Sequence, residues 1–241
     1  HTPQRSHRDS GHGDKGGTEV SMDLLWWGIF ITLGFFGGSI MFCKLLAEWL
    51  CGKDICRLSD DGNPGAANLF IHCGVGAGML GLALDMLKGF LPVFLAYRHF
   101  GVSDPAFAVV MMAPVLGHAI APLNHFKGGK CIATSFGVLI ALLPTTRIGL
   151  VLAAVYILFS TIVKIQPNSR RSIFAFSIFL FISLPVLLYK HMAAVAFGCA
   201  MISLTAIYKH VIAERHSESL IEKISDSEKE NVEAEAGSTA K

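Results

Sequence analysis

Paired lysines around a glycine pair are the residues whose types and spacing most directly suggest chemistry. Lys127 and Lys130 flank Gly128 and Gly129, immediately before an apolar run that begins at Cys131. Glycine N–H groups, two ammonium charges and a helix N-terminus all favour a phosphate group. Lysines that only anchor one side of a membrane protein would not need the glycine pair between them. The segment therefore predicts an anion site.

A second polar segment, residues 52–68, follows the first apolar run and is rich in turn formers. Asn63 and Asn68 carry side-chain donors, and Gly65 opens an apolar helix whose free N–H groups could receive an anion. The same residues suit a turn followed by a helix cap, because Asn and Gly tolerate turn conformations. Taken alone, the segment favours the turn and cap.

Further candidates lie in a later loop and near two helix ends. Ser169, Arg170 and Ser172 belong to a loop in which arginine either binds phosphate oxygens or anchors the inner membrane face. His210 follows the last apolar run and could act as a base or lie at the interface without a task. His118 is better explained by a hydrogen bond inside a helix bundle.

Metal and cofactor sites are not expected. The six cysteines include no CxxC pair, and four of them lie within apolar runs, where cysteine packs as a small hydrophobe. A disulfide between Cys51 and Cys56 is possible in principle, but their loop is predicted to lie in the reducing cytoplasm. The net charge is only +2 and the basic residues are scattered, so nucleic acid is not an expected partner.

The apolar runs that must position these residues are predicted to be membrane helices. The chain is 52% hydrophobic and 16% charged, whereas soluble proteins carry about a quarter charged residues. A span needs about 20 residues, so the fourth apolar run is short and the last three are borderline. We predict an all-α membrane helix bundle of about seven spans, some short or broken, and place the stretch 90–96 at the interface or as a cap of the second helix. The seven runs are Leu24–Cys43, Ala66–Leu84, Ala106–Leu123, Cys131–Leu143, Ile148–Val163, Ile173–Leu188 and Met192–Ile207.

The chain divides into a membrane domain, residues 23–212, and two polar ends. Residues 1–22 lack an apolar stretch and are predicted to be a disordered extension, with Met22 as the natural start. Residues 213–241 are predicted to be an acidic, largely disordered tail after one or two more helical turns. With the N-terminal extension left out, the loop set that includes Lys127 and Lys130 holds nine Lys and Arg residues against four in the opposite set. The C-terminus and the polar loops are therefore predicted inside.

One charged pair falls within an apolar region. Asp85 and Lys88 are spaced i and i+3 near the far end of the second run, which places them side by side on a helix. A charge inside a membrane is costly unless it is paired. We expect a structural ion pair there, outside the active site.

Several motifs, taken in order, resemble one known family. They are Gly38-Ser-Ile, Gly62-Asn-x-Gly-Ala-x-Asn68, Leu84-Asp-Met-Leu-Lys-Gly-Phe-Leu-Pro92 and Gly117-His with Phe126-Lys-Gly-Gly-Lys-Cys-Ile-Ala-Thr134. From about residue 24 to 210 the chain resembles the bacterial acyl-phosphate:glycerol-3-phosphate acyltransferases of the PlsY type. The resemblance implies a seven-span inner-membrane enzyme of phospholipid biosynthesis. Such an enzyme moves a fatty acyl group from acyl phosphate to glycerol 3-phosphate, gives lysophosphatidate and needs no metal.

The resemblance assigns roles to individual residues. Lys130 falls on the family's active-site lysine and His210 on its catalytic histidine, which makes these two the expected catalytic residues. Ser169 and Ser172 fall on the Ser-x-x-Ser-Ile segment. The remaining expected substrate-binding residues are Asn63, Gly65, Asn68, His118, Lys127, Gly128, Gly129 and Arg170.

Three positions depart from the family pattern. Asp61 replaces a serine, Ile71 an arginine and Ala213 an asparagine. An aspartate near bound phosphates should repel them unless a cation such as Arg57, Arg170 or Arg171 neutralises it. The alternative is a catalytically altered relative that binds phosphate esters or lipid headgroups without this reaction; a transporter is a weaker third possibility.

Overall fold

The computed structural model describes residues 15–59 and 61–239, and within these residues it contains helices and no strands. The all-α prediction is confirmed. The helices are α1 (Lys15–Gly38), α2 (Phe42–Cys51), α3 (Ile55–Leu58), α4 (Ala66–Phe100), α5 (Ala106–Ile120), α6 (Ile132–Ala141), α7 (Gly149–Ile157), α8 (Asn168–Tyr189) and α9 (Ala193–Thr239), with a 3₁₀ turn at Pro122–Asn124 and a π turn at Leu158–Ile162.

Each predicted apolar run forms helix, but the count of seven spans is not confirmed. Among the described residues, four helical segments are long and apolar enough to cross a membrane, and the α1–α2 pair, bent by 41°, would make a fifth. The fourth and fifth runs form only short apolar helices, Ile132–Ala141 and Gly149–Ile162. The fourth run ends early because Pro144 follows it, and the residue before a proline is disfavoured in a helix.

The stretch 90–96 does not form a separate interfacial element. It belongs to α4, which continues to Phe100 and has one non-helical residue, Gly74, with φ of 85°. Asp85 and Lys88 therefore lie in the interior of this long helix and not near its end, contrary to the prediction.

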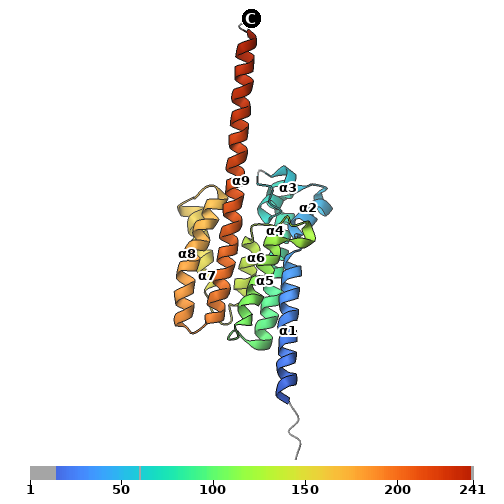
Figure 1. The fold of residues 1–241 in the computed structure, drawn as a ribbon, viewed down its shortest axis with the longest axis vertical. Helices are drawn as coiled ribbons and strands as arrows, with labels where there is room; N and C mark the ends of the chain where they lie inside the picture. The colour runs from blue at the N-terminus through green and yellow to red at the C-terminus, as the bar shows by residue number, and fades with distance from the viewer. Residues whose placement is uncertain (1–14, 60, 240–241) are drawn as a thin grey trace, which may run out of the picture.

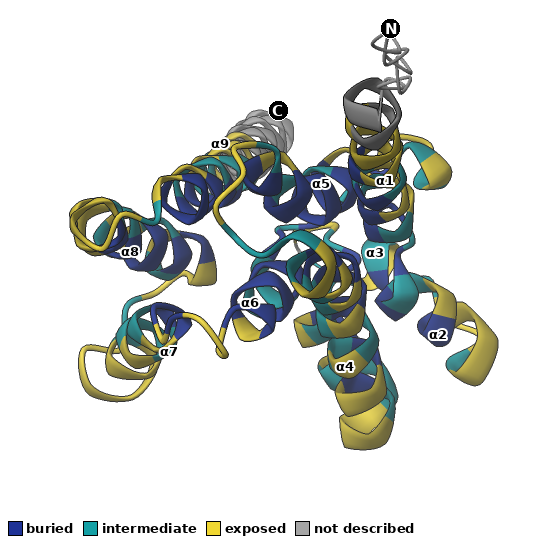
Figure 2. Ribbon diagram, turned by 90° about the horizontal axis from the view of Figure 1, so that it is seen from below, coloured by how far each residue is buried: buried dark blue, intermediate teal, exposed yellow. Residues whose placement is uncertain are grey.

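Helices α1 and α5 approach each other closely at glycines, which have no side chain to separate the two backbones. A Cβ on Gly38 of α1 would lie 2.2 Å from the carbonyl oxygen of Pro114 in α5, and one on Gly117 of α5 would lie 1.9 Å from that of Phe35. Small residues let membrane helices approach to backbone contact. Figure 2 shows the buried faces of α5, α6 and α9 turned toward the middle of the bundle, with α7 and α8 on one side and α1 to α4 on the other.

The last helix extends well beyond the others. Figure 1 shows α9 leaving the body at the end where α2 and α3 lie, while the start of α1 lies at the opposite end. The continuous helix runs to Thr239, further than the one or two turns predicted from the sequence. The first helix begins at Lys15, before Met22; residues 1–14 of the predicted extension lie outside the described residues. The domain boundaries and the natural start stay predictions.

Candidate active site

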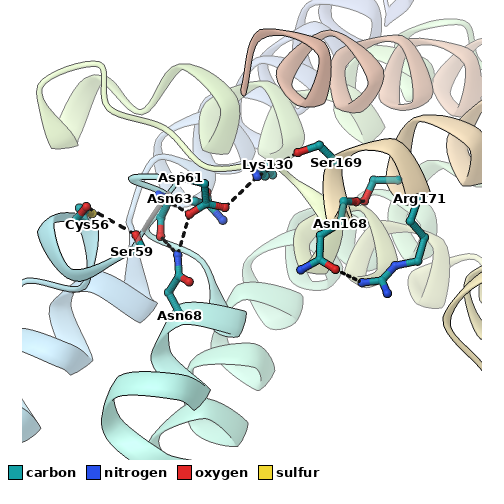
Figure 3. A network of polar contacts seen from close by, with 10 residues as sticks. Cys56, Ser59, Asp61, Asn63, Asn68, Lys130, Asn168, Ser169 and Arg171 are labelled. Carbon is teal, nitrogen blue, oxygen red and sulfur yellow. Dashed lines mark hydrogen bonds and ion pairs between the residues drawn. The ribbon is translucent and has the colours of Figure 1, made fainter. Parts of the chain in front are cut away.

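Lys130 is the centre of a polar cluster at the end of the bundle where α9 leaves it. Its Nζ lies 2.8 Å from Oδ2 of Asp61 and 3.2 Å from Oγ of Ser169 (Figure 3). Asp61 comes from the loop before α4, Lys130 from the segment before α6, and Ser169 from the first turn of α8. Three segments far apart in the sequence thus meet at one ammonium group.

The loop before α4 holds Asp61 by its other oxygen. Oδ1 accepts hydrogen bonds from the backbone N–H of Asn63, at 3.1 Å, and from Nδ2 of Asn68, at 3.0 Å. Asn68 also donates to the backbone oxygen of Asn63, at 2.8 Å. Burial raises the pKa of Asp61, but the hydrogen bond and charge of Lys130, with the donors from Asn68 and Asn63, outweigh it and hold the pKa below its ordinary value. Asp61 is therefore ionised at neutral pH.

The cation that neutralises Asp61 differs from those predicted. None of the three arginines proposed from the sequence contacts it: Arg57 pairs with Asp54 at 3.3 Å, and Arg171 donates to Asn168 at 2.6 Å. Arg170 binds carboxylates of α9. The neutralising cation is Lys130 itself.

The loop forms the predicted turn and cap. Asp61 folds the turn through the N–H of Asn63, and Gly65 is the N-cap residue of α4, where it makes no side-chain hydrogen bond. The capping aspartate is Asp54, whose Oδ1 accepts from the N–H of Cys56, at 3.0 Å, at the start of α3. Asp60 lies outside the described residues.

The glycine pair before Lys130 packs against the end of α5. A Cβ on Gly128 would lie 2.1 Å from the carbonyl oxygen of Ala119, and one on Gly129 would lie 2.3 Å from Nε2 of His118. The N–H of Gly129 already donates to the His118 carbonyl, at 3.0 Å. The pair therefore has a packing role, which the anion interpretation did not include.

Lys127 is not brought into the cluster. Its side chain is exposed and lines neither of the cavities beside Lys130. The sequence predicted one anion site formed by Lys127, Gly128, Gly129 and Lys130. In the structure only Lys130 of the two lysines lines the cavities, and Lys127 is exposed.

Both candidate histidines are buried. His210 of α9 is 1% exposed, and its two ring nitrogens have no hydrogen-bond partner among the described residues. The charges of Lys130 and Asp61 act on its ring, but His210 lines neither of the cavities beside Lys130. His118 is also buried, and its Nδ1 has no partner in the described part of the chain, so the predicted bundle hydrogen bond from its ring is not observed there.

Two cavities, each of about 500 Å³, share Lys130. We name them the apolar cavity and the polar cavity. The apolar cavity is lined mainly by hydrophobic side chains together with Asn63, Gly65, His118, Asp85 and Lys130; its apolar members include Phe70, Leu82, Met86, Ile132 and Phe136. The polar cavity is lined by Asp61, Asn68, Ile71, Lys130, Gln166, Pro167, Asn168, Ser169, Arg170, Ala213, Glu214 and Glu218.

The start of α8 divides the predicted Ser-x-x-Ser pair. Ser169 faces Lys130, whereas Ser172 is buried one turn further along and donates to the Asn168 carbonyl, at 3.0 Å. Arg170 lies at the polar cavity, where it pairs with Glu214 and, at 3.3 Å, with Glu218. Sequence reasoning missed both glutamates because they were assigned to a disordered tail. Their spacing of four and eight residues after His210 on one helix was the available signal.

All three departures from the family pattern line the polar cavity. Asp61, Ile71 and Ala213 come from three different segments and meet there. Their convergence on one cavity identifies it as the place where this chain differs chemically from the pattern it resembles.

The chain is similar to known proteins over most of the region that contains these residues. The family described as glycerol-3-phosphate acyltransferase matches residues 28–218. The glycerol-3-phosphate acyltransferase of Thermotoga petrophila is 42% identical over 118 residues, which is 48% of this chain and 58% of that protein. That of Myxococcus xanthus is 40% identical over 127 residues, 53% of this chain and 65% of the relative. The match thus spans less than two thirds of the length of these curated relatives.

Two solved structures match over a larger share of the fold. The crystal structure of PlsY, an integral membrane glycerol 3-phosphate acyltransferase, in its glycerol 3-phosphate form superposes with a TM-score of 0.68 at 28% identity, covering 80% of this chain and 92% of that one. Its lysophosphatidic acid form gives a TM-score of 0.65 at 29% identity, covering 76% and 87%.

Proposed function

The chain belongs to the glycerol-3-phosphate acyltransferase family, and from this premise we propose that it transfers a fatty acyl group from acyl phosphate to glycerol 3-phosphate. The products are lysophosphatidate, for phospholipid synthesis, and inorganic phosphate. The observation that carries the proposal is the position of Lys130, at the junction of an apolar and a polar cavity. An acyl donor needs the first environment for its chain, and a phosphate-bearing acceptor needs the second.

The proposed chemistry depends mainly on positioning. An acyl phosphate is already activated, so holding the acceptor hydroxyl beside its carbonyl supplies much of the acceleration. Lys130 stabilises charge on the departing phosphate. For this, its ammonium group exchanges Asp61 for a phosphate oxygen. We assign to His210 the role of accepting the hydroxyl proton or orienting the acceptor, because its ring nitrogens have no hydrogen-bond partner among the described residues and the charges of Lys130 and Asp61 act on its ring.

The roles of the other side chains follow from the cavity that each one lines. Asn63, Gly65 and His118 line the apolar cavity near Lys130 and bind the donor's phosphate end. Asn68, Ser169 and Arg170 line the polar cavity and bind the acceptor. Ser172 stabilises the first turn of α8 through its hydrogen bond to the Asn168 carbonyl, and exposed Lys127 is assigned no contact with either substrate.

The test is an assay of purified protein in detergent with acyl phosphate and glycerol 3-phosphate. The wild type should release lysophosphatidate, and Lys130→Ala should lower turnover about 10²- to 10³-fold, the effect of removing one electrostatic stabiliser. Lys190→Ala, an exposed lysine at the end of α8, is the matched control and should retain activity. An equal loss of turnover in Lys127→Ala would instead support the anion site predicted from the sequence, in which both lysines bind phosphate.

A second candidate function is binding of phosphate esters or lipid headgroups without acyl transfer. The observation that favours it is the composition of the polar cavity. There the Lys130 ammonium is paired with the Asp61 carboxylate, and the side chains of Ile71 and Ala213 offer no polar group. Saturable binding of glycerol 3-phosphate without any lysophosphatidate from the wild type would support this alternative.

The proposed location is a bacterial inner membrane, with the C-terminus and the active site in the cytoplasm. The excess of Lys and Arg in the loops on the side of Lys130 supports this orientation, and it grows when Lys88, which lies buried within α4, is removed from the opposite set. Cysteines introduced at Arg57 and at Asp104, both exposed, test it after Cys51, Cys56 and Cys73 are replaced by alanine, which leaves only the buried Cys43, Cys131 and Cys199. In intact cells an impermeant maleimide should label position 104 and not position 57; the reverse pattern would invert the orientation.

A further inference from the structure

Arg170 is held at the polar cavity by two carboxylates of α9. Its Nε contacts Oε1 of Glu214, and its Nη2 lies 3.3 Å from Oε1 of Glu218. All three side chains line the cavity that also contains Lys130. The two glutamates are one helical turn apart, so they present their carboxylates to the same guanidinium.

The two carboxylates are not equivalent. The side chain of Glu214 is 17% exposed, whereas that of Glu218 is 61% exposed. Exposed ion pairs are weak because water and salt screen them and two long side chains must be ordered. Glu214 is therefore the fixed partner of Arg170, and Glu218 is the partner that another anion can replace.

A phosphate group is the anion best suited to replace it. Carboxylate and phosphate oxygens bind the guanidinium fork in the same way, and phosphate carries more charge. Lys130 also lines the polar cavity, so its positive charge adds to that of Arg170 in attracting an anion. An acceptor that carries phosphate would thus take over the Arg170 donor that Glu218 now occupies.

We infer that Glu218 is a specificity-determining residue: its carboxylate competes with the acceptor's phosphate for Arg170, while Glu214 keeps the guanidinium aimed into the cavity. This inference rests on the proposed acyl transfer to glycerol 3-phosphate. It predicts that removing the charge of Glu218 strengthens acceptor binding and that removing the charge of Glu214 weakens it. A purely structural role for the two glutamates would not give effects of opposite sign.

Steady-state kinetics separate these effects. Glu218→Gln should lower KM for glycerol 3-phosphate about two- to five-fold with kcat unchanged, the size expected for one exposed ion pair. Glu214→Gln should raise KM, because Arg170 loses the contact that orients it. Asp23→Asn, an exposed carboxylate near the start of α1, removes the same charge at the other end of the bundle and should change neither constant.

Chemical labelling gives a readout that needs no turnover. Phenylglyoxal should modify Arg170 faster in Glu218→Gln than in the wild type, and inorganic phosphate should protect it. Arg171, bonded to Asn168, is the internal control in the same peptide and should label equally in both proteins. Mass spectrometry of the labelled peptide measures both arginines.

The outcomes distinguish this inference from the proposed function. An unchanged or raised KM in Glu218→Gln overturns the competition, even if the wild type is an active acyltransferase. An inactive wild type overturns the acyl transfer, yet labelling with phosphate protection still tests the competition at Arg170. Equal labelling of Arg170 in both proteins also overturns it.

Discussion

Two aspartate–lysine pairs in this protein have the same separation and different surroundings. Lys130 and Asp61 are 2.8 Å apart with side chains 12% and 34% exposed, and Lys88 and Asp85 are 2.8 Å apart with side chains 3% and 2% exposed. The first pair joins segments 69 residues apart in the sequence, and the second is a local pair within α4. Their chemistry is identical, so their environments must account for any difference in role.

The pair in α4 is tied into fixed structure on both sides. Lys88 also donates to the carbonyl oxygen of Ile40, at 2.5 Å, and Sγ of Cys43 donates to Oδ2 of Asp85, at 3.1 Å. These bonds link α4 to the break between α1 and α2. A buried charge needs such partners, because its desolvation is costly. Asp85 also lines the apolar cavity, but these bonds engage both of its oxygens and the Lys88 ammonium, so the pair stabilises the fold.

The ion pair between Lys130 and Asp61 can be exchanged for a contact between Lys130 and a ligand. Water and ligand can reach Lys130 from two sides, since both cavities are lined by it. A phosphate oxygen can then replace the Asp61 carboxylate at modest cost, because a partly exposed ion pair contributes little. The comparison teaches that exposure, and not separation, decides whether an ion pair is structural or exchangeable.

The largest expected effect comes from breaking the α4 pair. Lys88→Met leaves Asp85 charged and buried, and should destabilise the protein by about 3–5 kcal/mol. Thermal unfolding in detergent measures the loss. The double variant Lys88→Met with Asp85→Leu removes both charges and should recover most of the stability. A single variant as stable as the wild type would contradict the structural role and weaken the contrast between the pairs.

A smaller effect is expected from the packing that places Lys130. Gly129→Ala puts a methyl group against the His118 ring and should cost about 1–3 kcal/mol through overpacking. His118→Ala, added to it, should restore stability because it removes the opposing ring. Gly128→Ala is the control: its Cβ meets the backbone of Ala119, so His118→Ala should not rescue it. If His118→Ala rescued both glycine variants, the segment that contains Gly128 and Gly129 would be free to move, and its packing would not fix the position of Lys130.

The sequence predicts the local pair and not the distant one. Asp85 and Lys88 are three residues apart, so helix geometry alone places them together. Asp61 was expected to meet an arginine, because nothing in the spacing of residues shows which cation folds against it. Lys130 was identified through its motif, whereas its ion pair depends on how the glycine pair packs against α5.

The same limit explains what else was missed. Glu214 and Glu218 were assigned to a disordered tail because the acidic composition there outweighed their helical spacing. Helix lengths followed hydrophobicity well, yet α6 is too short to span, a consequence of a proline and a left-handed Cys131 at its two ends. The placement of Ile71 and Ala213 in one cavity also depends on tertiary structure.

The smallest effect, and the sharpest test of the comparison, is expected from Asp61→Ser. The substitution frees Lys130 for the donor's phosphate, and it should lower KM for acyl phosphate up to about fivefold, since a partly exposed pair is worth at most about 1 kcal/mol. Asp61→Asn is the matched control because it removes the charge and keeps the shape and one acceptor. Steady-state kinetics with acyl phosphate and glycerol 3-phosphate measure both variants.

The pH dependence of the same variant has a definite sign. The pKa of Asp61 lies below its ordinary value, so the stability from its ion pair is present above that ordinary value and is lost as pH falls through the lowered pKa. The difference in stability between wild type and Asp61→Ser should therefore be constant around neutral pH and vanish in acid. Unchanged kinetics would mean that Asp61 only folds the turn with Asn63. A large loss of activity would mean instead that its carboxylate takes part in the reaction as a general base, because loss of a merely competing charge cannot slow turnover.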